Sequence, residues 1–166
     1  MSEKGILFKK EMREAAARGD KTKTRRLSGL EEINKDPDSY QFKDWTHDGC
    51  ASFVRRFRHS HEFEFVKLRY QVGNLLYVKK NYFTKKADAE LWLEIVDVRI
   101  ERLQDISLED IEDEGVPLIN TGPSGEKGVL AYEDFRILWD SINAKKGFGW
   151  DTNPWVAVYT FKRIDK

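Results

Sequence analysis

Hydrophobic and polar positions alternate in short runs along most of the chain, and this pattern predicts more strands than helices. Strands are predicted at 6–8, 22–27, 75–78 and 155–164, and residues 53–57 and 63–70 are predicted to form a hairpin. Helical spacing predicts helices at 9–18 and 131–145. Ser107 is predicted to cap a third, short helix that ends at Gly115.

The longest β pattern, at 91–103, contains an irregularity. Its apolar positions change parity, from Leu91, Leu93 and Ile95 to Val96, Val98 and Ile100. Such a slip requires a bulge or a strong bend, as in a curled sheet. Segment 155–164 has large or branched side chains on both faces, which predicts a central strand. We therefore expect an α+β fold, a small open or closed β-barrel with helices packed on its outside.

The length of 166 residues and the 21 aromatic side chains predict a single domain over 1–166. Residues 28–71 are expected to form an irregular insertion, since 28–50 lacks apolar periodicity, and glycine-rich 119–128 a mobile loop. No apolar stretch approaches the ~20 residues that span a bilayer, and Cys50 has no partner for an internal disulfide. A cytoplasmic protein without a membrane partner is expected.

Charge is balanced overall, with 29 basic and 29 acidic side chains, but it is segregated along the chain. Residues 1–28 hold nine basic and four acidic side chains, 51–86 hold nine and two, and 87–141 hold four and fifteen. Two readings are open. The basic segments meet in one positive face that attracts phosphates, or they pair with the acidic segment as salt bridges.

The densest polar cluster spans 19–26, directly after the first helix. Strand alternation places Thr22, Thr24 and Arg26 on one face, with Lys23 and Arg25 on the other. The Arg26 fork suits a phosphate or a carboxylate. Lys21 would act as a base toward Thr24 if neighbouring arginines lowered its pKa. The alternative is an exposed basic strand whose threonines serve only β propensity.

A strand, a helix and then Gly19, Lys21, Thr22, Thr24 and Arg26 resemble the signature of the ASCH domain superfamily. The resemblance continues through 72–78 and 96–115. The stretches 139–143 and 153–162 resemble the C-terminal part of bacteriophage and prophage members. The resemblance to ASCH domains implies a PUA-like β-barrel and a protein that binds RNA or a modified nucleoside.

The resemblance also implies an alternative, a hydrolase. Some small ASCH proteins are amidohydrolases on N4-acetylated cytidine, and others have been described as ribonucleases. By motif position, Lys21 would be the base, Thr24 the nucleophile and Glu114 the acid or orienting group. Glu114 also reads as part of a solvated acidic helix face. The chain departs from the enzyme pattern at Asn74, where many relatives have Asp, and at 79–81, which favours binding without turnover.

Binding is thus the expected function, and the basic cleft would be built on Lys21–Arg26. Aromatic residues in 51–86 suit either base stacking or the core of a hairpin. The candidate residues for nucleic-acid or substrate binding are Thr22, Lys23, Arg26, Arg55, Arg56, Arg58, Lys79 and Lys80.

The sequence also leads to expectations about metals, a protein partner and the oligomeric state. His59, His61 and Cys50 lack a fourth ligand at zinc-finger spacing, so neither a metal nor a cofactor is expected. A third possibility is a phage protein-interaction module whose partner binds the 28–71 segment. We expect a monomer or a weak dimer.

Overall fold

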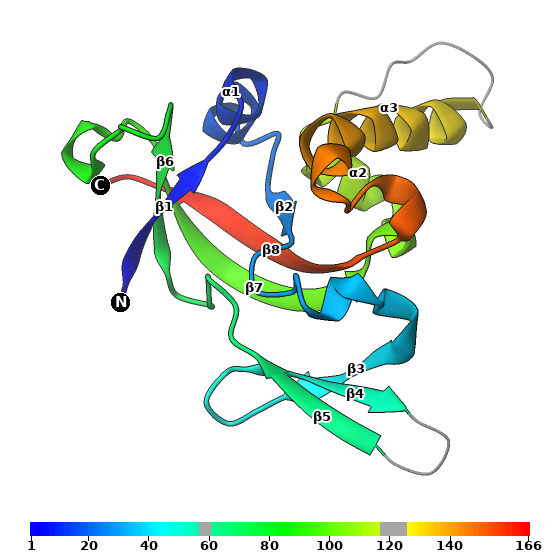
Figure 1. Ribbon diagram of the computed structural model, residues 1–166. Helices are drawn as coiled ribbons and strands as arrows, with labels where there is room; N and C mark the ends of the chain where they lie inside the picture. Colours follow the sequence, from blue (N-terminus) through cyan, green and yellow to red (C-terminus); the bar gives the residue numbers. More distant parts are fainter. Residues whose placement is uncertain (57–60, 117–125) are drawn as a thin grey trace.

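The computed structural model describes residues 1–56, 61–116 and 126–166 (Figure 1). Arg58 and most of the predicted mobile loop at 119–128 lie outside the described residues. The helices are α1 (Lys10–Arg18), α2 (Leu108–Asp113) and α3 (Glu126–Asn143). The strands are β1 (Glu3–Leu7), β2 (Lys23–Arg26), β3 (Tyr40–Trp45), β4 (Ala51–Arg56), β5 (His61–Val66), β6 (Leu75–Lys79), β7 (Trp92–Arg102) and β8 (Trp155–Ile164).

The predicted α+β class is confirmed, and the main sheet has five strands in the order β1-β6-β7-β8-β2. Strands β1 and β6 are parallel, and the other neighbours are antiparallel. The sheet does not close into a barrel, because edge strands β1 and β2 share no backbone ladder. A side chain joins them instead, since Arg26 Nη2 donates to the Leu7 carbonyl at 2.9 Å. The candidate site lies at this gap in the backbone ladder, which buried side chains fill.

Strand β7 has the predicted irregularity. Its register against β8 shifts between Ile95 and Asp97, and Val96 is left 41% exposed between them. A bulge adds one unpaired residue to the strand, so the apolar residues after it fall on odd instead of even positions of the alternation, or the reverse. This accounts for the irregular pattern in the sequence. Strand β8 lies between β7 and β2, as its two apolar faces predict.

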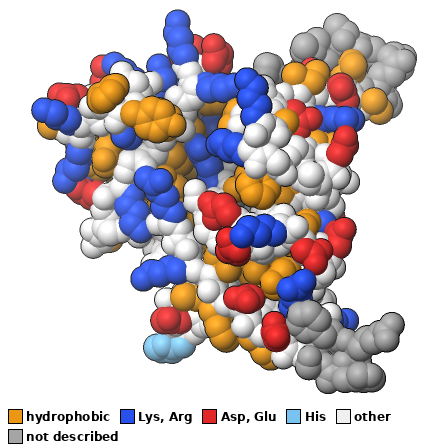
Figure 2. All heavy atoms as spheres, in the orientation of Figure 1, with side chains coloured by type: hydrophobic (Ala, Val, Ile, Leu, Met, Phe, Trp, Pro, Cys, Tyr) orange, Lys and Arg blue, Asp and Glu red, His pale blue; other side chains and the backbone are white. Residues whose placement is uncertain are grey.

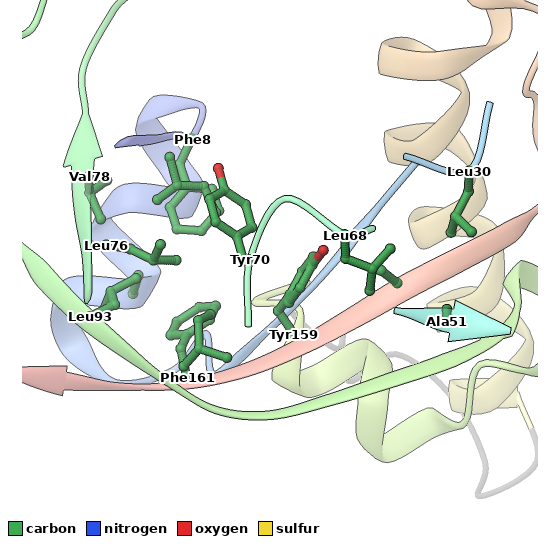
Figure 3. Close-up of a cluster of buried hydrophobic side chains, with 14 of the residues drawn as sticks. Phe8, Leu30, Ala51, Leu68, Tyr70, Leu76, Val78, Leu93, Tyr159 and Phe161 are labelled. Atoms are coloured by element: carbon green, nitrogen blue, oxygen red, sulfur yellow. The ribbon is translucent and has the colours of Figure 1, made fainter. Parts of the chain in front are cut away.

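Each face of β8 contributes to a different part of the core. Ala157, Tyr159 and Phe161 pack in a cluster with Phe8 and Tyr70, which Figure 3 shows in close-up. On the other face, the neighbouring residues of β8 pack against α2 and α3, in a second cluster that contains Val156, Val158, Ile111, Phe135 and Trp139. The central strand is buried from both sides, and helices cover one of them.

Segment 28–71 is more ordered than its composition predicts. Strands β3, β4 and β5 form a separate antiparallel sheet, and the predicted hairpin is confirmed as β4 paired with β5. Leu30 and Ile33 are almost fully buried in the main core, as is Phe53. Isolated apolar side chains anchor this segment to the core. Because they do not recur at a helical or strand period, the sequence pattern could not predict their burial. Within the described part of the chain, none of the helices is long and apolar enough to cross a bilayer.

Candidate functional site

Strand β2 is held between helix α1 and helix α2. Gly19 ends α1 with φ of 88°, a left-handed conformation that glycine adopts at little cost. The backbone then turns back, and the Lys21 N–H donates to the Ala15 carbonyl at 3.2 Å. The Thr22 N–H donates to the Asp113 carbonyl of α2 at 2.8 Å. These contacts place β2 at the edge of the sheet with α2 against one of its faces.

The face of β2 toward α2 carries a buried network of charges. The guanidinium of Arg25, 1% exposed, donates to Glu101 at 2.6 Å, to Glu114 at 3.0 Å and also to Asp110. Lys23 contacts Asp110 at 2.7 Å and Asp113 at 2.8 Å. Burial opposes the charged forms of these groups, but the carboxylates outweigh it and raise the pKa of Arg25 and of Lys23. For these two cations, pairing with the acidic segment is confirmed.

Lys21 lies at the junction of this network with the other face of β2. Its ammonium donates to the carboxylate of Glu114 at 2.9 Å, to the Glu114 carbonyl at 2.7 Å and to the Lys23 carbonyl at 2.8 Å. It also lies 5.4 Å from the centre of the Phe8 ring. Burial lowers the pKa of Lys21, and Arg26 and Arg25 act in the same direction against Glu114.

The structure thus brings Lys21 and Glu114 together across 93 residues of sequence. Both carboxylate oxygens of Glu114 accept hydrogen bonds, one from Lys21 and the other from Arg25. Glu114 is buried, so it does not belong to a solvated helix face. Its carboxylate is fixed at the end of α2, where Ser107 caps the first turn as predicted and accepts from the Asp110 N–H at 3.1 Å.

The opposite face of β2 carries Thr24 and Arg26. Thr24 is 4% exposed and faces Tyr159 in the β2–β8 register. The carbonyl that Lys21 binds belongs to the peptide bond that joins Lys23 to Thr24. Arg26 lies 5.4 Å from the centre of the Phe8 ring, so this ring has both cations near it. Lys21 and Arg26 therefore share the Phe8 ring beside the gap between β1 and β2, and Thr24 lies on the same strand.

Two buried donors in this group find no acceptor among the described residues. They are the Arg26 Nε atom and the Tyr159 hydroxyl. Burial raises the pKa of Tyr159, opposed in part by the Tyr70 backbone N–H, which points at the hydroxyl oxygen, and by Arg26, so the hydroxyl keeps its proton at neutral pH. Tyr70 packs edge-on against Tyr159, with 5.2 Å between the ring centres, and the Tyr70 hydroxyl donates to the Gly5 carbonyl. Buried donors of this kind normally have a partner.

The surface of the molecule is concave on one side. Figure 2 shows a hollow near the centre of the face, bordered by Lys and Arg side chains and by hydrophobic ones. A cavity of about 440 Å³ adjoins the group through Tyr70. It is lined by Trp45, His47, Asp48, Gly49, Tyr70, Gln71, Val72 and Val98. The tip of the β3–β4 hairpin forms one wall, so part of segment 28–71 borders the site.

The remaining candidate residues lie on other elements, at the ends of strands or on the other face of β2. Arg55 and Arg56 are on β4 of the second sheet, where Arg55 pairs with Asp36 and Arg56 donates to Gln41. Lys23 faces α2, on the side of β2 away from Arg26. Thr22 precedes β2, and Lys79 and Lys80 lie at the end of β6. The two basic segments thus do not merge into one uniform positive face.

Metal-ligating residues do not cluster in the part of the chain that the structure describes. Cys50 precedes β4 and His61 pairs with the last residue of β4, so these two lie at opposite ends of that strand. Tyr159 and Phe8 were not among the candidates from sequence. An aromatic residue in an apolar strand is typical of the core, and only the unpartnered hydroxyl distinguishes Tyr159.

This geometry defines an α+β domain with an open sheet. Its two edge strands, β1 and β2, are joined by a side chain and not by a backbone ladder. A solved ASCH domain from Lactobacillus crispatus JV V101 is similar, with a TM-score of 0.53, 15% identity and coverage of 98% of this chain and 79% of that one. A protein from Enterococcus faecalis V583, described by the family model DUF984, has a TM-score of 0.50, 12% identity and coverage of 99% and 77%. The chain therefore has an ASCH-like fold. No family model and no curated protein matches it by sequence.

Proposed function

We propose that this protein binds RNA or a modified nucleoside in the gap between β1 and β2. The observation that carries the proposal is the pair of buried, unpartnered donors, Arg26 Nε and the Tyr159 hydroxyl. Both donors are buried, so an oxygen of a nucleobase or of a phosphate would reach them only after the side chains around them shift. The ASCH-like fold agrees with this ligand class, since the resemblance in sequence implies the same. The relation to phage and prophage proteins stays a prediction.

The test is binding of a mononucleotide and its nucleoside to purified protein by calorimetry. Cytidine and cytidine 5′-monophosphate separate recognition of the base from recognition of the phosphate. Tyr159→Phe removes one neutral hydrogen bond and should weaken binding about 3- to 10-fold. Arg26→Lys keeps the charge but loses the fork, and the loss should be about tenfold or more.

Arg55→Gln is the matched control, because it removes a cation of the second sheet. Its affinity should equal that of the wild type. The proposal fails if neither compound binds, or if Arg55→Gln weakens binding as much as Arg26→Lys does.

The contact between Lys21 and Glu114 supports a second candidate, the hydrolase. Thr24 would attack the acyl carbon of an amide such as N4-acetylcytidine while Lys21 accepts the hydroxyl proton. The C–N bond then breaks, the nitrogen takes a proton, and water hydrolyses the acyl ester to release acetate. Because both oxygens of Glu114 accept hydrogen bonds from cations, an orienting role suits it better than proton donation.

This candidate is tested by incubating the protein with N4-acetylcytidine and, separately, with RNA, and by separating the products. A base at Lys21 must lose its proton, so turnover should rise with pH toward the lowered pKa of Lys21. Thr24→Ser should retain activity and Thr24→Val should lose it. Absence of product from both substrates eliminates the hydrolase.

A further inference from the structure

The connection between β6 and β7 exposes two neighbouring aromatic side chains. Tyr82 is 81% exposed and Phe83 is 90% exposed, more than any other described aromatic residue. In Figure 1 this segment lies at the upper left, and Figure 2 shows hydrophobic side chains there among Lys and Arg side chains. Two adjacent, fully exposed rings are costly to leave in water without a use.

Polar contacts fix the backbone around these rings. Thr84 Oγ1 accepts from the backbone N–H groups of Lys80 and Asn81, both at 3.1 Å. Asn81 Oδ1 accepts from the Phe83 N–H at 2.9 Å. Lys79 Nζ donates to the Tyr82 carbonyl at 2.7 Å. The segment is thus held in a shape that presents both rings, and little conformational entropy would be lost on binding.

The same segment is rich in lysine. Lys79 and Lys80 precede the rings, and Lys85 and Lys86 follow them. Lys80 pairs with Glu90 and Lys86 with Glu3, so the charge is partly compensated at the margins of the segment. Exposed rings between lysines are the combination that stacks unpaired bases and follows a phosphate backbone. A partner of negative charge with flat apolar faces fits this surface.

A short series of contacts links this segment to the gap between β1 and β2. Lys79 faces Leu7 in the β1–β6 register, and the Leu7 carbonyl accepts from Arg26. Arg13 Nη1 donates to the Phe8 carbonyl at 3.1 Å and to the Lys80 carbonyl at 3.4 Å. The aromatic segment therefore adjoins the rim of the candidate site.

We propose that Tyr82 and Phe83 stack two bases of a single-stranded RNA whose neighbouring nucleotide occupies the gap. This inference rests on the proposed function and deepens it, because it makes the ligand a strand instead of a free nucleoside. The bases stack without sequence preference, since every base has an aromatic face. Selectivity for the modified or unmodified base comes from the donors of Arg26 and Tyr159.

The experiment compares two ligands on three proteins. A labelled single-stranded RNA of about eight nucleotides is titrated by fluorescence anisotropy, and cytidine 5′-monophosphate by calorimetry. The variant is Tyr82→Ala with Phe83→Ala. The matched control is Phe63→Ala with Phe65→Ala, an aromatic pair on β5 that is 57% and 63% exposed beside two glutamates. All four side chains lie at the surface, so thermal stability should be unchanged.

The expected result is RNA affinity at least about tenfold weaker for Tyr82→Ala with Phe83→Ala and mononucleotide affinity equal to the wild type. The β5 control should bind both ligands as the wild type does. Unchanged RNA affinity in the variant overturns the inference while mononucleotide binding still supports the proposed function. Equal losses in both pairs, or a change in oligomeric state in the Tyr82 and Phe83 variant, also overturn it. Failure of the wild type to bind either ligand refutes the proposed function itself.

Discussion

The buried pair of Lys21 and Glu114 allows a quantitative test of how the site is held. Lys21 is 3% exposed, and its ammonium lies 2.9 Å from the carboxylate. Glu114→Gln keeps the shape but removes the charge that compensates Lys21. Lys21→Met keeps an apolar chain of similar length and removes the other charge. The double variant removes both.

The magnitudes follow from the distance and the burial. At 2.9 Å the attraction is about 6 kcal/mol for an effective dielectric constant of about 20. Desolvation costs several kcal/mol per ion, so the intact pair contributes little net stability. Breaking it leaves a buried charge without compensation. Each single variant should therefore lose about 3 kcal/mol of unfolding free energy. The double variant should also lose about 3 kcal/mol, because the Glu114 and Lys23 carbonyls lose the Lys21 donor and Arg25 loses a charged acceptor. A loss of about 3 instead of about 6 is a coupling of about 3 kcal/mol.

The assay is denaturant unfolding of the four proteins at pH 7, with the same slope against denaturant in all of them. The exposed pair of Arg18 and Asp20 is the control, because its N–O distance is 2.8 Å but both side chains are 62% exposed. Arg18→Gln and Asp20→Asn should each change stability by less than about 1 kcal/mol. If the Lys21 and Glu114 losses simply add, to within about 0.5 kcal/mol, the two groups are not coupled and the reasoning is wrong.

Two further predictions concern the surroundings of this pair. Burial opposes the charge of Asp110, but Lys23 and Arg25 outweigh it and hold the pKa of Asp110 below 3.8, so the unfolded chain binds more protons there. The resulting stability is complete above that pH and is lost as pH falls through the folded pKa. Asp110→Asn should flatten the acid decline in melting temperature more than Asp113→Asn, and equal profiles would contradict this. Gly115→Ala should cost about 1–2 kcal/mol more than Gly147→Ala in denaturant unfolding. Both glycines have positive φ, but only at Gly115 does an added Cβ lie 3.0 Å from Lys21 Cβ. Equal losses of unfolding free energy at the two positions would show that the side chains around Gly115 move to accommodate the added methyl group.

Local patterns were enough to predict much of the fold. Strand 155–164 and the slip at Val96 follow from the alternation of apolar residues, because β8 is buried on both faces and β7 contains a bulge. Closure of the barrel could not be predicted in this way, since it depends on whether β1 and β2 meet. Leu30 and Ile33 were missed because single apolar residues in an irregular segment have no period.

Some residues of the candidate site could be predicted from the sequence and others could not, because contacts between distant segments depend on packing. Charge along the chain left two readings open, because pairing depends on which face of β2 packs against α2. The resemblance to ASCH domains singled out Lys21 and Glu114, and the structure places them in contact. The Tyr159 hydroxyl could not be recognised from sequence, since its lack of a partner is a property of the packed core.

Strand β2 shows why pairing with the acidic segment involves only one of its faces. Its alternate residues face opposite sides, so Lys23 and Arg25 are neutralised by α2 while Thr24 and Arg26 border the gap. The first face stabilises the position of the strand, and that position fixes the second face toward β1. Lys21 belongs to both, because Glu114 holds its ammonium while Phe8 lies beside it in the gap. The acidic helix thus neutralises Lys23 and Arg25 but does not pair with Arg26. By pairing with one face, it leaves Arg26 on the other face free to reach the Leu7 carbonyl of β1.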